Sequence, residues 1–335
     1  MIRRAGWIAG IAIVSVAAGF QELGDHYLLS LEHPAIQYGS RPPKDPVSEL
    51  NRKIQLGSTR LKFERSSGYL RSVLDALDVP IQSQVAVFSK TSLQKEHISP
   101  YTPRAIYFND AVVVAWMRGG FIELAAHDPQ QGVNFYTLEQ IQTEQPAFRH
   151  GSSNCLGCHV TEMTLGVPGM LVRSTYTSPD GNPMLIYGSP AVDHRSPLAE
   201  RWGGWYVTGD PGANLHLGNA MITETGQPES IVTKETLRQD SLRGKIDQSA
   251  YLAPLSDVAA LMVFDHQMHM INLLTRVGWE IRMGFYQKQT PNLLLAVAPD
   301  GRRNLSTMVM EVTSELVDYM LFVDEAPLSG KMQSI

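Results

Sequence analysis

Residues 112–138 read VVVAWMRGGFIELAAHDPQQGVNFYTL, and this stretch decides the fold class. β-Branched and aromatic residues gather in three runs, and the turn-forming pairs Gly119-Gly120 and Asp128-Pro129 separate these runs. Such runs joined by such pairs are typical of hairpins. The pattern predicts an antiparallel meander with strands over residues 112–117, 121–125 and 134–138, extended towards the N-terminus by strands over 85–89 and 105–108.

Other segments have a helical or a mixed pattern. Asp45-Pro46 predicts an N-cap followed by a helix over residues 46–56, and an apolar face with helical spacing predicts a second helix over 67–78. Beyond Pro254 the sequence predicts long helices over 256–287 and 305–323. Shorter strand signals occur over 171–176, 184–187 and 205–208, the first two on either side of a turn at 178–183.

The segment Gly151–His159 reads GSSNCLGCH and contains both cysteines of the chain. The pattern C-x-x-C-H is typical of covalent haem attachment. Two thiols separated by two residues can each bond one vinyl group of a porphyrin, and the adjacent imidazole can then ligate the iron. We therefore expect one haem c per chain, held by Cys155 and Cys158, with its iron ligated by His159.

Two other kinds of site use closely spaced cysteines. A thioredoxin-like pair would lie at a strand-to-helix turn of a βαβ unit, whereas the residues around Cys155 read as polar loop. A structural zinc site would need further ligands, and the chain has no second pair of cysteines. The haem interpretation is therefore favoured.

The second axial ligand determines whether such an iron transfers electrons or binds small molecules. We expect His216, which lies in the glycine-rich stretch 209–219, with His266 as the alternative. Helical spacing puts His266 on an apolar stripe with Met262, Met270, Leu273 and Val277. His269 instead shares a polar stripe with Asp265, Asn272 and Arg276. A histidine on an apolar stripe is otherwise more often a core residue than a ligand.

Methionines are further candidates for the second iron ligand, and one aromatic segment is a candidate for contact with the haem. Met163, Met170 and Met221 are alternative ligands, although methionine commonly fills core space. The segment 201–206 reads RWGGWY. In this segment Trp202 could pack against a haem, and Arg201 could form an ion pair with a haem propionate. Arg104 is a second candidate for the ion pair with a propionate. A bent strand with core aromatic residues explains the same segment equally well.

The N-terminus has the pattern of a secretory signal. Arg3 and Arg4 precede an almost wholly apolar stretch from Ala5 to Ala18 that ends in small residues. We expect residues 1–18 to be a signal peptide and the protein to be periplasmic or otherwise exported. If this segment is not cleaved, it would anchor the chain to a membrane.

Composition limits the partners. The formal net charge is −5, and the sequence has no block of basic residues longer than Arg302-Arg303. Nucleic acid is therefore excluded as a standing partner, because binding phosphates requires clustered Lys and Arg. The sequence contains no P-loop, G-x-G-x-x-G, H-E-x-x-H or G-x-S-x-G motif, so no catalytic residue is assigned.

Three segments together carry a resemblance: residues 103–110 (PRAIYFND), the Cys155–His159 motif followed by 166–169 (GVPG), and 201–209 (RWGGWYVTG). With these segments the chain resembles a poorly characterised family of bacterial monohaem cytochrome-c-domain proteins over about residues 80–325. The resemblance implies haem binding and electron transfer with redox partner proteins. A haem enzyme acting on peroxide or a small oxidisable molecule, or a haem-based sensor, is the alternative.

The expected fold class is α+β, with an antiparallel strand-rich central region that carries the haem loop and a helical C-terminal part. It does not look like a small all-helical class I cytochrome c. The expected organisation is an N-terminal linker with short helices over 19–80, the strand-rich haem-binding region over 81–250 and the helical region over 251–335.

Overall fold

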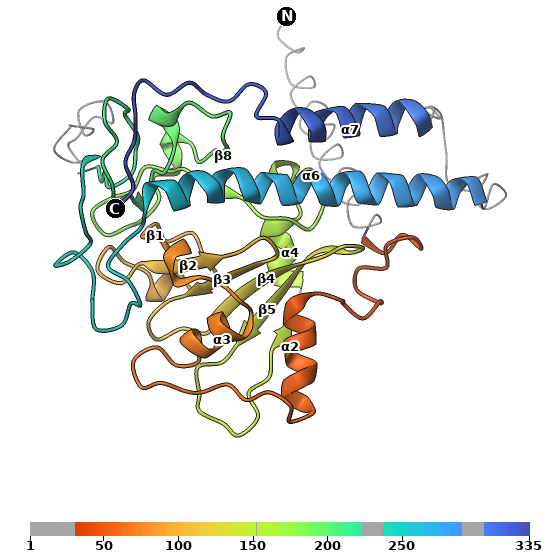
Figure 1. Cartoon of the computed structure of the whole chain (residues 1–335), viewed down its shortest axis with the longest axis horizontal. Helices are drawn as coiled ribbons and strands as arrows, with labels where there is room; N and C mark the ends of the chain where they lie inside the picture. Colours follow the sequence, from red (N-terminus) through yellow and green to blue (C-terminus); the bar gives the residue numbers. More distant parts are fainter. Residues whose placement is uncertain (1–30, 152, 223–236, 290–304) are drawn as a thin grey trace, which may run out of the picture.

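A computed structural model describes residues 31–151, 153–222, 237–289 and 305–335 (Figure 1). Its centre is a seven-stranded sheet with the order β6-β5-β4-β3-β2-β1-β9, in which every neighbouring pair is antiparallel. The strands are β1 (Val85–Val87), β2 (Arg104–Phe108), β3 (Val112–Trp116), β4 (Ile122–Asp128), β5 (Gly132–Leu138), β6 (Arg149–His150) and β9 (Trp205–Tyr206). The predicted α+β class and the predicted meander are confirmed.

Two turns of the meander are closed by Asn or Asp side chains that accept hydrogen bonds from nearby backbone N–H groups. Asn109 Oδ1 accepts hydrogen bonds from the backbone N–H groups of Ala111 and Val112, which closes the β2–β3 turn. Asp128 Oδ1 does the same for Gln130 and Gln131 between β4 and β5. These local bonds fix the register, so that every second side chain of a strand points to the same face.

Two layers of helix cover the two faces of the sheet (Figure 1). On the first face, Val114, Leu124 and Tyr136 pack against α2 (Pro46–Gln55) and α3 (Leu70–Ala76). On the second face, Ile106, Val113 and Phe135 belong to one cluster with residues of α6 (Val258–Gln289). The sheet is therefore buried on both faces, which explains why β3 is apolar throughout.

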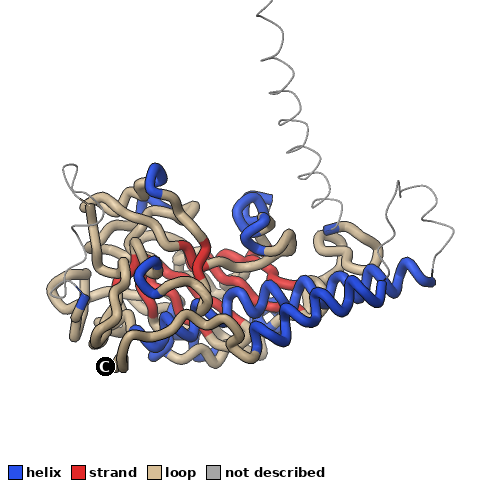
Figure 2. The backbone as a smooth tube through the Cα atoms, turned by 90° about the horizontal axis from the view of Figure 1, so that it is seen from above, coloured by secondary structure: helices blue, strands red, loops and turns tan. Residues whose placement is uncertain are grey.

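The helical C-terminal part is also confirmed. α6 has 32 residues and begins close to the bounds expected from the sequence. α7 (Leu305–Met320) lies beside α6 (Figure 2), where Leu316 and Tyr319 pack against Leu273 and Val277. Asp45 caps α2 through the backbone N–H groups of Val47 and Ser48, as the Asp45-Pro46 pair predicted.

Several short elements differ from the expectation. Residues 184–187 form no strand; they contain the 3₁₀ turn η4 (Leu185–Tyr187), whose side chains are exposed. The run 171–176 contributes only β7 (Val172–Arg173), which pairs with β8 (Ala191–Val192) in a small separate sheet. The remaining 3₁₀ turns are η1 (Ile81–Ser83), η2 (Lys95–His97), η3 (Glu162–Thr164) and η5 (Leu198–Glu200).

The N-terminal part packs onto the fold from Leu31 onward. Leu31, Ile36 and Tyr38 are buried in a cluster with Val167 and Trp279, so this part of the expected linker belongs to the core. The expected signal peptide over residues 1–18 lies outside the described residues. Within the described ranges, no helix combines the length and apolar character that a bilayer crossing requires.

Candidate functional site

The two cysteines lie on a short helix, α4 (Ser153–His159), rather than in the loop that the flanking residues suggested. The chain reaches α4 from β6 through Gly151, whose N–H donates to the Phe135 carbonyl at 2.5 Å. A Cβ atom at position 151 would lie 2.9 Å from that carbonyl oxygen and 3.0 Å from the Cys155 Sγ atom. Glycine therefore allows the helix to start close against β5.

The helix sets the relative positions of the motif residues. Cys155 and His159 are four residues apart, so they lie on one side of α4. Cys155 and Leu156 are partly buried against the second face of the sheet, whereas Cys158 is exposed. No disulfide joins the two cysteines. One thiol therefore lies at the core and the other at the surface.

The His159 imidazole is held in one orientation and one tautomer. Its Nδ1 atom lies 2.9 Å from the Gly169 carbonyl oxygen, and its ring packs on Phe135 with 4.5 Å between ring centroids. Because a carbonyl only accepts, Nδ1 carries the proton and Nε2 has the lone pair. Burial lowers the pKa of His159, which favours this neutral form. No described residue bonds to Nε2, so this atom can ligate a metal.

The loop after the motif folds back onto His159. The Gly169 N–H donates to the His159 carbonyl at 3.0 Å, and the Thr164 hydroxyl donates to the same oxygen at 3.3 Å. The reversal of the chain uses left-handed backbone at Leu165 and Gly166, with φ of 59° and 71°. The histidine and the carbonyl that orients it therefore belong to one hydrogen-bonded loop.

Asn272 of α6 ties this loop to the body of the fold. Its Oδ1 atom accepts from the Met170 N–H at 2.8 Å, and its Nδ2 atom donates to the Met170 carbonyl at 2.6 Å. Asn272 is buried, so the pair is shielded from water. Because Met170 directly follows Gly169, this amide fixes the position of the carbonyl that holds His159.

Replacing Asn272 with alanine should lower the free energy of unfolding by about 2 kcal/mol or more, because both backbone groups of Met170 would be left buried without partners. Urea unfolding of Asn272→Ala and the parent measures the change. Gln267→Ala is the matched control, since Gln267 is an α6 amide whose bonds to Asn109 and Asp110 lie nearer the surface. Equal effects of the two substitutions would contradict the assigned role.

The whole polar stripe of α6 faces the chain between residues 165 and 202. Asp265 accepts from Trp202 Nε1 at 2.8 Å, and Arg276 Nη1 donates to the Leu165 carbonyl at 2.7 Å. His269 lies beside Arg195, whose Nη2 donates to His269 Nε2 at 3.1 Å. The stripe therefore supplies the partners that a buried loop requires.

A cavity of about 210 Å³ lies between the loop after His159, the segment around Asp193 and α6. Met163, Met170 and His269 are among the residues that line it. Burial lowers the pKa of His269 to about 4, so its imidazole is neutral at pH 7. The sequence analysis did not choose His269 as a ligand because it lies on the polar stripe of its helix, whereas His269 lines this cavity and His216 and His266 do not.

His216 is completely buried beside Trp202, with 5.4 Å between ring centroids. Neither ring nitrogen of His216 has a hydrogen-bond partner in the described part of the chain. Burial lowers the pKa of His216 to about 4. The imidazole is therefore neutral and unusual in having no bonded partner.

The structure does not bring His216 and His159 together. His159 packs on β5, whereas His216 precedes residues that bond to the Arg201 and Trp205 carbonyls next to β9. β5 and β9 are five strands apart in the sheet order. Two axial ligands of one iron have their nitrogens about 4 Å apart, at twice the usual metal–nitrogen distance.

His266 faces α7 instead of the motif. Its ring stacks on Tyr319 and Phe322, with centroid distances of 4.8 and 4.3 Å and interplanar angles of 11°. Its Nδ1 atom lies 2.9 Å from His194 Nδ1. The apolar stripe of α6 that carries His266 therefore packs against α7.

Met221, a candidate iron ligand, and Arg104, a candidate partner of a propionate, lie on opposite faces of the central sheet. Met221 packs with the first-face cluster, on the side of the sheet away from α6. Arg104 is on the second face, where its Nε atom lies 3.4 Å from Glu123 Oε2. Among the causes that shift the pKa of His159, burial is the largest, and Arg104 also lowers it, which indicates that this arginine is near the motif.

Arg201 and Trp202 are part of the framework. Arg201 donates to the Ser196 and His194 carbonyls and lies 3.6 Å from Asp265. Trp202 is fully buried, with its indole N–H on Asp265. Burial raises the pKa of Asp265 to about 8, although Arg201 opposes this shift. The hydrogen-bond donors of Arg201, which the sequence analysis offered to a haem propionate, are therefore already bonded within the protein.

No protein-family model matches the chain, and no match was found among curated proteins or solved structures. The case for a function therefore rests on the residues described above.

Proposed function

We propose that this protein is an exported c-type cytochrome that carries one covalent haem on Cys155 and Cys158 and takes part in electron transfer. The observation that carries the proposal is the tautomer of His159, whose Nδ1–H is bonded to Gly169 and whose Nε2 is left with its lone pair. An axial histidine needs this arrangement, because a hydrogen bond at one nitrogen orients the other towards the metal.

The residues of α4 fit the group that the motif predicts. Cys158 is exposed and Cys155 is partly buried, so a porphyrin held by both would have one edge at the surface and the other against the protein. Bound haem would supply a one-electron iron couple. The chain's own residues would hold the imidazole neutral, fix its orientation and leave an edge accessible to a redox partner protein.

A second candidate function is the binding of a small ligand, either by a haem enzyme acting on peroxide or a small oxidisable molecule or by a haem-based sensor. In the described part of the chain the His216 ring packs beside Trp202 and the His266 ring stacks on Tyr319, and these contacts favour it over a bis-histidine iron. An iron with one protein ligand has an open position.

The test is expression with and without a complete haem-attachment system, followed by mass measurement and haem staining of denatured protein. We expect one covalent haem, lost in the double variant Cys155→Ala, Cys158→Ala. A parent chain that keeps its apo mass under these conditions would contradict the proposal. N-terminal sequencing of the product tests the expected export, because a mature start near Ala18 or Gly19 shows cleavage.

Spectra then separate the two functions. A low-spin ferrous form that does not bind CO would support electron transfer, and a high-spin form that binds CO would support the second candidate. If the parent is low-spin, Met163→Ala, Met170→Ala and His269→Ala test the residues of the neighbouring cavity. His216→Ala and His266→Ala are expected to leave the spectrum unchanged.

A further inference from the structure

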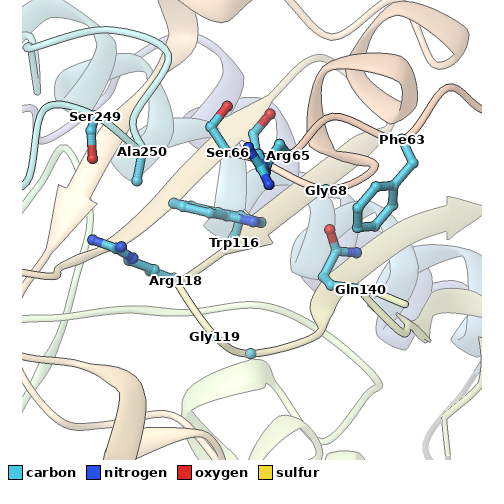
Figure 3. A pocket seen from close by; sticks show the side chains of 12 residues that line it. Phe63, Arg65, Ser66, Gly68, Trp116, Arg118, Gly119, Gln140, Ser249 and Ala250 are labelled. Atoms are coloured by element: carbon cyan, nitrogen blue, oxygen red, sulfur yellow. The ribbon is translucent and has the colours of Figure 1, made fainter. Parts of the chain in front are cut away.

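A second cavity, of about 360 Å³, lies on the first face of the sheet, away from α4 (Figure 3). It lies where the turn before α3 approaches the β3–β4 turn and the segment 249–250. Its volume is in the range of pockets that hold small molecules. Nothing in the proposed cytochrome function uses this cavity.

The charged residues that line this cavity are both arginines. Its lining contains Arg65 and Arg118 and no Asp or Glu, in a chain whose formal net charge is −5. Asp247 forms an ion pair with Arg118. Arg65 is exposed and forms no ion pair with any described residue. The cavity therefore has one uncompensated guanidinium, which would attract an anion.

The Trp116 indole adds a second donor to this cavity. Trp116 is only 3% exposed, and its ring is fixed by an edge contact with Tyr251 at 5.4 Å between centroids. In Figure 3 the indole lies between Arg65 and Arg118, with its nitrogen at the end nearer Arg65. In the described part of the chain the indole N–H forms no hydrogen bond, and its nitrogen is not among the buried atoms that lack a partner. The N–H is therefore accessible from the cavity, where a ligand oxygen can accept a hydrogen bond from it.

The remaining lining suggests the body of the ligand. Phe63 and the Trp116 ring give two flat apolar surfaces, and Ser66 lies next to Arg65 at the rim (Figure 3). The turns on either side carry Gly68 and Gly119, with φ of 62° and 83°. At Gly68 a Cβ would collide with the Gln140 side chain, 1.9 Å from Oε1. These glycines leave the space between the two turns open.

We propose that this cavity binds a small organic anion, a carboxylate or a phosphate ester carried on a planar ring. The anionic group accepts hydrogen bonds from Arg65 and from Trp116 Nε1, and the ring packs against Phe63 and Trp116. Arg118 stays paired with Asp247 and borders the site.

The test is calorimetric titration of the purified protein at physiological salt with four probes: phenyl phosphate, benzoate, inorganic phosphate and benzyl alcohol. We expect saturable binding of phenyl phosphate or benzoate, weaker binding of inorganic phosphate and none of benzyl alcohol. The stronger of the first two identifies the anionic group. Benzyl alcohol binding as tightly as either anion, or no binding of either, would overturn the proposal.

Variants place the binding in this cavity. Arg65→Gln should weaken binding about tenfold or more, because it removes a charged donor. Trp116→Phe should weaken it less while keeping the ring. Arg60→Gln is the matched control: Arg60 is also exposed, but it does not line the cavity. If Arg60→Gln and Arg65→Gln weaken binding equally, the attraction is a diffuse effect of surface charge and the site is refuted.

Discussion

Replacing Gly169 with alanine is expected to lower the free energy of unfolding by about 2 to 4 kcal/mol. An added Cβ would lie 2.2 Å from Asn272 Oδ1 and 2.8 Å from Asn272 Cγ, with Thr164 Cβ at 3.2 Å on another side. The Asn272 amide cannot retreat without breaking both of its bonds to Met170. The substitution therefore combines overpacking with unpaired backbone groups.

Urea unfolding of Gly169→Ala should show a lower midpoint with an unchanged slope. The matched control is Gly278→Ala in α6, where the new Cβ would meet only the far end of the flexible Arg282 side chain. That control should be neutral or slightly stabilising, since alanine favours helix over glycine. A Gly169→Ala protein as stable as the parent would show that the loop can move away from Asn272.

The second large effect that we expect is a loss of folding stability at acidic pH. Burial lowers the pKa of His216 to about 4 in the folded protein, from the 6.5 that is usual for a histidine in an unfolded chain. The unfolded chain therefore binds a proton that the folded chain does not, so the stabilising contribution is complete above pH 6.5 and is lost as the pH falls from 6.5 towards 4. For His216 alone this amounts to about 3 kcal/mol.

Urea unfolding between pH 7 and pH 4.5 measures this loss. His216→Leu should flatten the pH dependence, because leucine does not titrate. His97 is exposed, and His97→Leu serves as the control that should keep the pH dependence of the parent. His194 and His269 have pKa values lowered in the same direction, so part of the acid sensitivity will remain in His216→Leu. A His216→Leu protein as acid-sensitive as the parent would refute the prediction.

The elements predicted correctly are those whose signal is local. The meander over β1–β5 follows from short runs of β-branched and aromatic residues and from turn residues such as Asn109 and Asp128, which bond to their own neighbours. The Asp45 cap and the two C-terminal helices are equally local. The pairing of β9 with β1 is different, because it joins Trp205 to Val87 and no nearby pattern specifies it.

The candidate site was predictable in its chemistry and not in its surroundings. The C-x-x-C-H motif predicts Cys155, Cys158 and His159 as the haem-holding residues without the fold, and this assignment stays a prediction. The sequence could not predict which neighbour each face of α6 contacts, because an apolar face can pack against another helix as well as against a prosthetic group. In this protein α7 covers the apolar stripe of α6. The polar stripe contacts the buried loop after His159, because the backbone groups of that loop need hydrogen-bond partners.

The Asn272–Met170 pair also sets an order of events during folding. Its two residues are 102 positions apart, and the meander, whose contacts are short in sequence, can form before α6 has been synthesised. Until α6 docks, the second face of the sheet stays open and nothing clamps the carbonyl that orients His159. The imidazole therefore acquires its fixed orientation late, and Cys155 stays accessible until α6 has docked on the second face of the sheet.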